Sequence, residues 1–318
     1  MLEVVLLSFP ALALFIVFVV VPVVLAAYYG FYQWKGYGSV SETGTFVGFE
    51  NYRQIFADPD FQSSLKNTLE ITVLSLVFQA PLAILFALLL NQKFKGRGLI
   101  RTLIFVPYVI SEVIVGTGWT LILQSNGALN DVLEKIGVKG ADWISNPSIA
   151  LWALMIIITW KYIGFAVILL LAGMQGIPEE LYEAAKVDGA GFWQLQRSIT
   201  LPLLGPTIRV WAFLSIIGSL QLFDLVWIIW RMISTTAGTS TMAVYMFIYG
   251  KNSNNYGYGS AVAVIMFFIS LVISLLYQKF MLNRDLDGAL TQKTANKKHD
   301  GVWGRHAVNV VSDKAEVM

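Results

Sequence analysis

Residues 149–172 read IALWALMIIITWKYIGFAVILLLA, an apolar run in which Lys161 is the single charge. About 20 mostly apolar residues form a helix long enough to cross the hydrocarbon core of a bilayer. We therefore expect this stretch to be a transmembrane helix. Five further segments meet the same criterion, so the sequence predicts an all-α membrane protein with six spans. The expected spans cover residues 4–29, 69–90, 99–123, 149–172, 203–230 and 260–280.

The composition of the whole chain agrees with lipid as its main surroundings. Of its 318 residues, 56% are hydrophobic and 13% are charged, whereas soluble domains carry about 25% charged residues. The chain has no cysteine, which excludes disulfides and thiolate metal sites. Its two histidines, His299 and His306, lie in a polar C-terminal stretch. We therefore expect membrane lipids around the chain, no metal site and no nucleic-acid partner.

Basic residues are concentrated in alternate loops. Lys93, Lys95, Arg97 and Arg101 follow the second span, and further lysines and arginines follow the sixth. By the positive-inside rule, both termini and the loop between spans four and five therefore face the cytoplasm. The expected membrane domain covers residues 1–282, and the polar stretch 283–318 is expected to be a disordered cytoplasmic tail.

The first apolar segment has an alternative interpretation as a secretory signal peptide. Glu3 is its only early charge, and its apolar run is longer than the hydrophobic region of a signal peptide. Both features favour a permanent transmembrane helix.

The loop of residues 173–202 has the most informative pattern outside the spans. Residues 176–202 read GIPEELYEAAKVDGAGFWQLQRSITLP. Pro178 suits the first turn of a helix, and the two glutamates that follow suit its positive N-terminal end. Gly189 is a natural stop, after which a second short helix is expected over residues 192–198. The sequence thus predicts a helix–turn–helix at the cytoplasmic face, whose small alanines leave room for a partner to approach.

This loop resembles the signature of permease subunits of binding-protein-dependent ABC importers, Glu-Ala-Ala-x3-Gly-x9-Ile-x-Leu-Pro. The matching positions are Glu183, Ala184, Ala185, Gly189, Ile199, Leu201 and Pro202, with Asp188 inside the motif. The resemblance implies that the loop docks in a cleft of a separate ATP-hydrolysing subunit and transmits its closure to the membrane domain. From the residues alone, the loop could also be an ordinary amphipathic connector that packs on its own helix ends.

Other short patterns resemble the carbohydrate branch of these importers, in particular the shorter subunits of the maltose-F and glycerol-phosphate-A type. They are GFENY at 48–52, Asn67-Thr68, Pro107, QLFD at 221–224 and GYGSA at 257–261. The resemblance implies half of a translocation pathway for a mono- or oligosaccharide in a bacterial or archaeal cell membrane. It also implies a second homologous permease, an ATPase dimer that binds ATP and Mg, and an extracytoplasmic sugar-binding protein. No cofactor is expected on this chain itself.

The resemblance also places sugar-facing positions, counted without gaps from Glu183, on the fourth and fifth spans. They are Ile158, Tyr162 and Phe165 in the fourth span and Ser215, Gly218, Ser219 and Leu222 in the fifth. Aromatic rings can stack on the C–H faces of a sugar while hydroxyls exchange hydrogen bonds with it. Aromatic residues in membrane helices are also common as simple packing, so both interpretations stay open.

Three ionisable residues lie within the expected spans, namely Glu112, Lys161 and Asp224. A charge at the centre of a bilayer costs about 2.5–3.5 kcal/mol on insertion scales, so each should face protein or water. Glu112 and Lys161 lie at similar depth in adjacent spans, so we expect them to pair, or Lys161 to line the polar path. The alternative is that the Lys161 side chain reaches up to an interface.

The sequence contains no Gly-x4-Gly-Lys-Ser/Thr phosphate loop and no visible catalytic constellation, so a non-catalytic subunit is expected. Two alternatives remain open. A stand-alone secondary transporter or channel would work without ATP and would show internal inverted repeats. An importer of another solute, such as glycerol phosphate, would favour several cationic groups along the path, where Lys161 is the one candidate.

Overall fold

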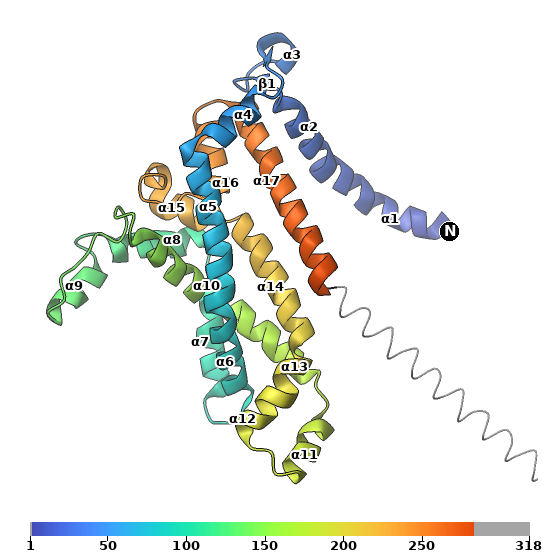
Figure 1. Ribbon diagram of the computed structural model, residues 1–318, viewed down its shortest axis with the longest axis vertical. Helices are drawn as coiled ribbons and strands as arrows, with labels where there is room; N and C mark the ends of the chain where they lie inside the picture. The colour runs from blue at the N-terminus through green and yellow to red at the C-terminus, as the bar shows by residue number, and fades with distance from the viewer. Residues whose placement is uncertain (1, 283–318) are drawn as a thin grey trace, which may run out of the picture. The chain divides into compact units, whose positions relative to one another are not determined.

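The computed structural model describes residues 2–282, which are mainly helical (Figure 1). The elements are α1 Leu2–Phe15, α2 Val21–Tyr29, β1 Tyr32–Gln33, α3 Val40–Thr43, β2 Thr45–Phe46, α4 Glu50–Ala57, α5 Pro59–Leu74, α6 Ala80–Asn91, α7 Arg97–Val109, α8 Glu112–Leu123, α9 Ala128–Lys135, α10 Ala150–Gln175, α11 Glu179–Val187, α12 Phe192–Leu195, α13 Leu201–Leu203, α14 Gly205–Leu220, α15 Asp224–Trp230, α16 Met242–Met246 and α17 Tyr256–Tyr277. Short π-helical turns continue several helices, at Ile16–Val20, Ser75–Gln79, Gln196–Thr200, Phe247–Asn252 and Gln278–Leu282, and a 3-10 turn covers Arg231–Ile233. The two strands form one short antiparallel pair.

The chain divides into two compact units, residues 1–272 and 273–318. Of the second unit, the structure describes the end of α17 and the π-helical turn after it, where side chains such as Leu275 and Leu276 are exposed. The division falls inside the last helix, before residue 282, where the sequence placed the end of the membrane domain. The expected tail, residues 283–318, lies outside the described residues.

Four helices of the described chain are long and apolar enough to cross a membrane: Leu7–Tyr29, Pro59–Asn91, Ala150–Gln175 and Tyr256–Met281. Two bent pairs raise the number to six if each pair crosses as one span, namely Arg97–Val109 with Glu112–Lys135 and Phe192–Leu203 with Gly205–Leu220. The expected all-α membrane fold with six spans is therefore confirmed, with some of the spans broken.

Two of the expected spans, 99–123 and 203–230, are not continuous helices, which corrects the sequence prediction. The third span breaks at Ile110 and Ser111, whose ψ angles of 139° and 141° are extended, and the helical stretch Glu112–Lys135, which contains α8, departs from α7 by 95°. The Ser111 hydroxyl caps the new helix by accepting a hydrogen bond from the Val113 amide.

The fifth expected span ends at Leu220, and a new helix, α15, begins at Asp224. A carboxylate suits this position because the N-terminal end of a helix is positive. The two short helices that follow the breaks, α8 and α15, pack against each other, with Gly116 facing the Ile228 side chain.

Helix α10 is the central helix of the first unit, with more than half of its 26 residues buried. Its first half packs in an apolar cluster with α15, and its second half packs in another cluster with α6 and α14. Figure 1 shows α5 and α6 running beside it, and α11 and α12 at one end of this bundle. Of the four continuous spanning helices of the described chain, α10 is thus the most enclosed by protein.

Gly164 brings α10 into close contact with α7. A Cβ at this position would lie 2.3 Å from the Ile104 carbonyl oxygen and 2.8 Å from the Phe105 Cα. Both neighbours are backbone atoms of a helix, so they cannot move aside cheaply. Glycine is therefore required here by the approach of two helices rather than by its backbone conformation.

A cluster of aspartates and tyrosines joins the start of α5 to α16 and α17. The Tyr245 hydroxyl donates to Asp58 at 2.5 Å and lies 2.6 Å from the Tyr258 hydroxyl, while Tyr249 donates to Asp60. Burial, followed by the hydrogen bond to Asp58, raises the pKa of Tyr245 far above its usual value. Tyr245 therefore stays protonated and remains a hydrogen-bond donor.

Replacing Gly164 by alanine should lower the thermal unfolding temperature of the purified protein in detergent, because overpacking of this kind costs about 1–3 kcal/mol. Gly98→Ala is the matched control, since a Cβ there meets no atom within 4 Å. In a helix, alanine is otherwise favoured over glycine by about 0.5–1 kcal/mol. The control should therefore be neutral or slightly stabilising, and an equal effect of the two variants would contradict the close packing.

Candidate functional site

A cavity of about 220 Å³ lies between the second, fourth and fifth spans, with the end of α7 at its side. Its lining residues are Ile71, Ser75, Gln79, Tyr108, Ile158, Tyr162, Phe165, Trp211, Leu214, Ser215, Gly218, Ser219 and Leu222. Seven of the eight positions that the sequence placed on a substrate path are among them. The eighth, Lys161, does not line the cavity.

Four polar or aromatic lining residues were missed from the sequence. Ser75 and Gln79 lie four residues apart in a π-helical turn of the second span, and both are buried. Two polar residues at this spacing in an apolar span could have been recognised as one polar face. The sequence did not single out Tyr108 or Trp211, and the position of Tyr108 also depends on the break in the third span.

Aromatic rings and small polar groups share the wall of this cavity. The rings of Tyr108 and Phe165 are stacked, with centroids 5.2 Å apart and planes 23° apart, and the Tyr162 ring stands edge-on to Tyr108 at 6.3 Å. The Ser75 hydroxyl is buried and has no hydrogen-bond partner within the described chain. No charged side chain is among the described residues that line the cavity. This wall suits an uncharged ligand that carries hydroxyl groups.

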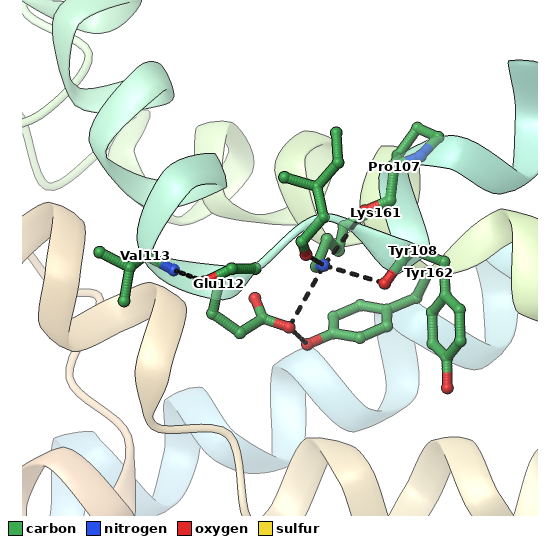
Figure 2. A network of polar contacts seen from close by, with 8 residues as sticks. Pro107, Tyr108, Glu112, Val113, Lys161 and Tyr162 are labelled. Carbon is green, nitrogen blue, oxygen red and sulfur yellow. Dashed lines mark hydrogen bonds and ion pairs between the residues drawn. The ribbon is translucent and has the colours of Figure 1, made fainter.

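Lys161 points from α10 into the break of the third span (Figure 2). Its ammonium donates hydrogen bonds to the carbonyl oxygens of Pro107 at 3.1 Å and Tyr108 at 3.2 Å, and also to that of Ile110. The lysine is 1% exposed. The alternative in which its side chain reaches an interface is therefore wrong.

Glu112, the first residue of α8, connects Lys161 to the cavity wall. Its Oε1 lies 3.5 Å from the Lys161 Nζ and accepts a hydrogen bond from the Tyr162 hydroxyl at 2.9 Å (Figure 2). The expected pairing of Glu112 with Lys161 is therefore confirmed. The lysine does not touch the cavity itself but is linked through Glu112 to Tyr162, which does.

Asp224, the third ionisable residue of the expected spans, lies outside this network. It begins α15, its side chain is exposed, and it is not among the lining residues of the cavity.

The predicted helix–turn–helix between spans four and five is present as α11 and the helical stretch from Phe192 to Leu203. The second part is longer than the expected 192–198, because a π-helical turn at Gln196–Thr200 leads into Pro202 without ending the helix. The hydroxyls of Tyr182 and Thr200 lie 3.0 Å apart and tie the two parts together.

The α11 side of this loop is open to a partner. None of the α11 residues is buried, and Val187 and Trp193 are 88% and 69% exposed. Glu183, Ala184 and Asp188 are exposed, Ala185, Ile199 and Leu201 are half-buried, and Pro202 is exposed. Gly189 has a φ of +82°, which favours glycine. A connector that packed on its own helix ends would bury α11, so the exposure favours a docking surface.

Exchanging the two charged partners, Glu112→Lys with Lys161→Glu, should abolish the yield of folded protein. A carboxylate at position 161 would face three carbonyl oxygens and repel them, so the ion pair cannot be inverted. The check is the monodisperse fraction on size-exclusion chromatography of the membrane extract. The Glu112→Gln variant, which keeps the lysine and its carbonyl contacts, serves as the control. Wild-type yield of the exchanged variant would contradict this assignment.

Residues 79–283 match a family described as the binding-protein-dependent transport system inner membrane component. A probable ABC transporter permease protein of Pyrococcus horikoshii is 35% identical over 84% of this chain and 91% of its own length. A trehalose/maltose transport system permease protein of Thermococcus litoralis is 35% identical over 74% of this chain and 79% of its own length. A chain in the crystal structure of a bacterial ABC transporter that imports the acidic polysaccharide alginate is 28% identical. It has a TM-score of 0.78 and covers 88% of this chain and 95% of its own.

Proposed function

Since this chain belongs to the family of binding-protein-dependent transport system inner membrane components, we propose that it forms half of the translocation pathway of an ATP-driven sugar importer. The observation that carries the proposal is the aromatic and hydroxyl-lined cavity among its spans. Its volume of about 220 Å³ is below the range of about 300–1,000 Å³ for small-molecule sites. A second, homologous permease would supply the facing wall.

The charge of the cavity favours a neutral sugar, whether a mono- or an oligosaccharide. The ammonium of Lys161 already has three carbonyl partners and one carboxylate, so it is not available to a ligand. A phosphate ester in this cavity would be an uncompensated charge, which is costly away from water. Glycerol phosphate is therefore the weaker alternative. The relative named for trehalose and maltose supports a neutral substrate, whereas the alginate importer carries an acidic one, so the neutral choice rests on the cavity lining.

The exposed loop supports a partner ATPase rather than a stand-alone transporter. We assign Glu183, Ala184, Ala185, Asp188, Gly189, Ile199, Leu201 and Pro202 to this contact. Burial of Val187 and Trp193 in a partner would remove apolar surface from water at about 25 cal/mol per Å². ATP and Mg would then bind to the ATPase dimer, and this chain would carry no cofactor.

The distribution of basic residues supports a cytoplasmic location for α11 and both termini. The opposite end, with α3 and α4, would then receive sugar from an extracytoplasmic binding protein. One similar structure contains an alginate ABC transporter in complex with an alginate pentasaccharide-bound periplasmic protein, which supports a partner of this kind.

The proposal is tested by purifying the tagged chain from its own membranes in mild detergent and identifying the chains that copurify. Reconstituted with these partners in liposomes, it should take up radiolabelled maltose or trehalose only with ATP inside and the binding protein outside. An excess of unlabelled glycerol 3-phosphate should not compete. Uptake by the chain alone without ATP would contradict the importer and support a secondary transporter.

Two glycines with similar backbone conformations distinguish loss of ATPase docking from general backbone strain. Gly189→Val should release the ATPase and lower ATP-driven uptake by at least about tenfold, since each 1.4 kcal/mol lost at an interface is a factor of ten. Gly137→Val is the matched control, because Gly137 has a φ of +79° against +82° for Gly189, and a Cβ at either meets no atom within 4 Å. Equal loss of the ATPase in both variants would argue against the loop as the docking site.

A second glycine pair tests the cavity. Gly218 lines it, and a Cβ there meets no atom within 4 Å, so the side chain of Gly218→Leu should extend from the helix into the cavity. Uptake should fall strongly while the ATPase still copurifies, because leucine is a better helix former than glycine. Gly118→Leu is the control, since Gly118 lies on α8 outside the cavity lining and a Cβ there also meets no atom within 4 Å. It should leave uptake near the wild-type rate, and unchanged uptake in Gly218→Leu would remove the cavity from the pathway.

A further inference from the structure

We propose that Lys161 is a positioning residue that holds the third span broken and thereby sets the aromatic wall of the cavity. Its link to sugar binding rests on the proposed function, whereas its hold on the break does not.

The end of α7 explains why a lysine is needed. The last carbonyls of a helix have no partner within that helix. In a membrane, each unsatisfied backbone group costs several kcal/mol, and irregular backbone survives there only where protein or water satisfies it. The break itself is short, since Val109 and Glu112 are separated by two residues, and it offers few donors of its own. The freed carbonyls must therefore find donors on a neighbouring helix.

The Lys161 ammonium has as many protons as there are carbonyl oxygens that accept from it at the break. It has three protons, and three carbonyl oxygens, those of Pro107, Tyr108 and Ile110, accept hydrogen bonds from it. All three contacts are shorter than the 3.5 Å between Nζ and Glu112 Oε1. The ammonium is thus primarily a cap for the backbone, and the carboxylate compensates its charge from farther away.

Each side of the break is tied to one ring of the cavity wall. On the α7 side, Lys161 holds the carbonyl of Tyr108, whose ring stacks on Phe165. On the α8 side, Glu112 accepts the hydrogen bond of Tyr162, the residue after Lys161. A continuous helix through Ile110 would redirect the helical stretch that contains α8 by about the observed 95°. Glu112 would then leave Tyr162, and the wall would lose its fixed geometry.

Spin labels measure the break directly. The chain has no cysteine, so Leu99→Cys and Leu121→Cys provide a unique pair, and both side chains are exposed. With a rise of 1.5 Å per residue, the two Cα atoms lie about 22 Å apart across the observed bend and about 33 Å apart in a straight helix. The full chain is labelled before it is combined with its partners, and the distance is then recorded by pulsed electron spin resonance on the importer complex in liposomes.

Four variants distinguish the hydrogen bonds of Lys161 to the carbonyl oxygens, here called the cap, from its ion pair with Glu112. Glu112→Gln removes the pair and keeps the cap, so the short distance should remain. The neutral double variant Glu112→Gln with Lys161→Met removes the cap without leaving a buried charge, so the distance should lengthen or broaden. Lys161→Met alone should do the same or fail to accumulate, since an unpaired carboxylate would remain. Lys161→Arg, which keeps several donors, should largely restore the short distance.

Uptake kinetics then report on the wall, with maltose and trehalose as the probes. The neutral double variant should lower the maximal ATP-driven uptake of the better probe by about tenfold at saturating binding protein, because the sugar reaches the cavity from that protein. Lys161→Arg should largely restore the uptake. A short, sharp distance in the double variant would overturn the cap. A lengthened distance with unchanged uptake would keep the cap as a hold on the break and overturn its role in setting the cavity wall, whereas the cavity itself is rejected only if Gly218→Leu also leaves uptake unchanged. Together, the double variant and Gly218→Leu therefore distinguish failure of this inference from failure of the proposed function.

Discussion

The membrane domain depends on one contact, in which the Lys161 ammonium meets three carbonyl oxygens at the break of the third span. A spanning helix can be interrupted only where its freed backbone groups are satisfied by protein or water. Here the donor comes from the middle of α10, which other spans enclose and where lipid cannot interfere. The lysine in turn needs a counter-charge, and Glu112 supplies it as the first residue of the helix that the break creates. The break and the buried cation therefore explain one another, and the carboxylate compensates the charge of the cation.

The same helix connects the cavity to the exposed loop. Helix α10 carries Tyr162 and Phe165 on the cavity wall and ends at Gln175, close in sequence to the start of α11. On its far side, the loop continues through the bent helical stretch into α14, which carries Ser215 and Ser219. Both walls that α10 and α14 give to the cavity thus lead directly to the surface proposed to bind the ATPase. A displacement of the loop would reach the cavity along two helices at once, which gives a physical basis for coupling between the sites.

Much of the fold could be predicted because apolar run length reports directly on spans, and the loop motif gave the helix–turn–helix. Spacing from that motif also gave seven residues that the structure brings to one cavity. The break of the third span was not predicted, although Ser111 followed by Glu112 is a start signal for a new helix, because the apolar length of residues 99–123 favoured a single continuous span. Tyr108 was missed for this reason. The pairing of Glu112 with Lys161 followed from their similar depth, whereas the carbonyl contacts did not, because the availability of backbone oxygens depends on where a helix stops.

The central claim is that this chain supplies one aromatic, uncharged wall of a sugar pathway shared with a second permease. Its most direct test is an electron cryomicroscopy map of the complex purified from its own membranes and saturated with maltose or trehalose under a non-hydrolysable ATP analogue. The account predicts sugar density against the rings of Tyr162 and Phe165, with a second permease across the cavity and an ATPase at α11. Sugar bound elsewhere while this cavity stays filled by its own side chains, or a particle without those partners, would contradict it.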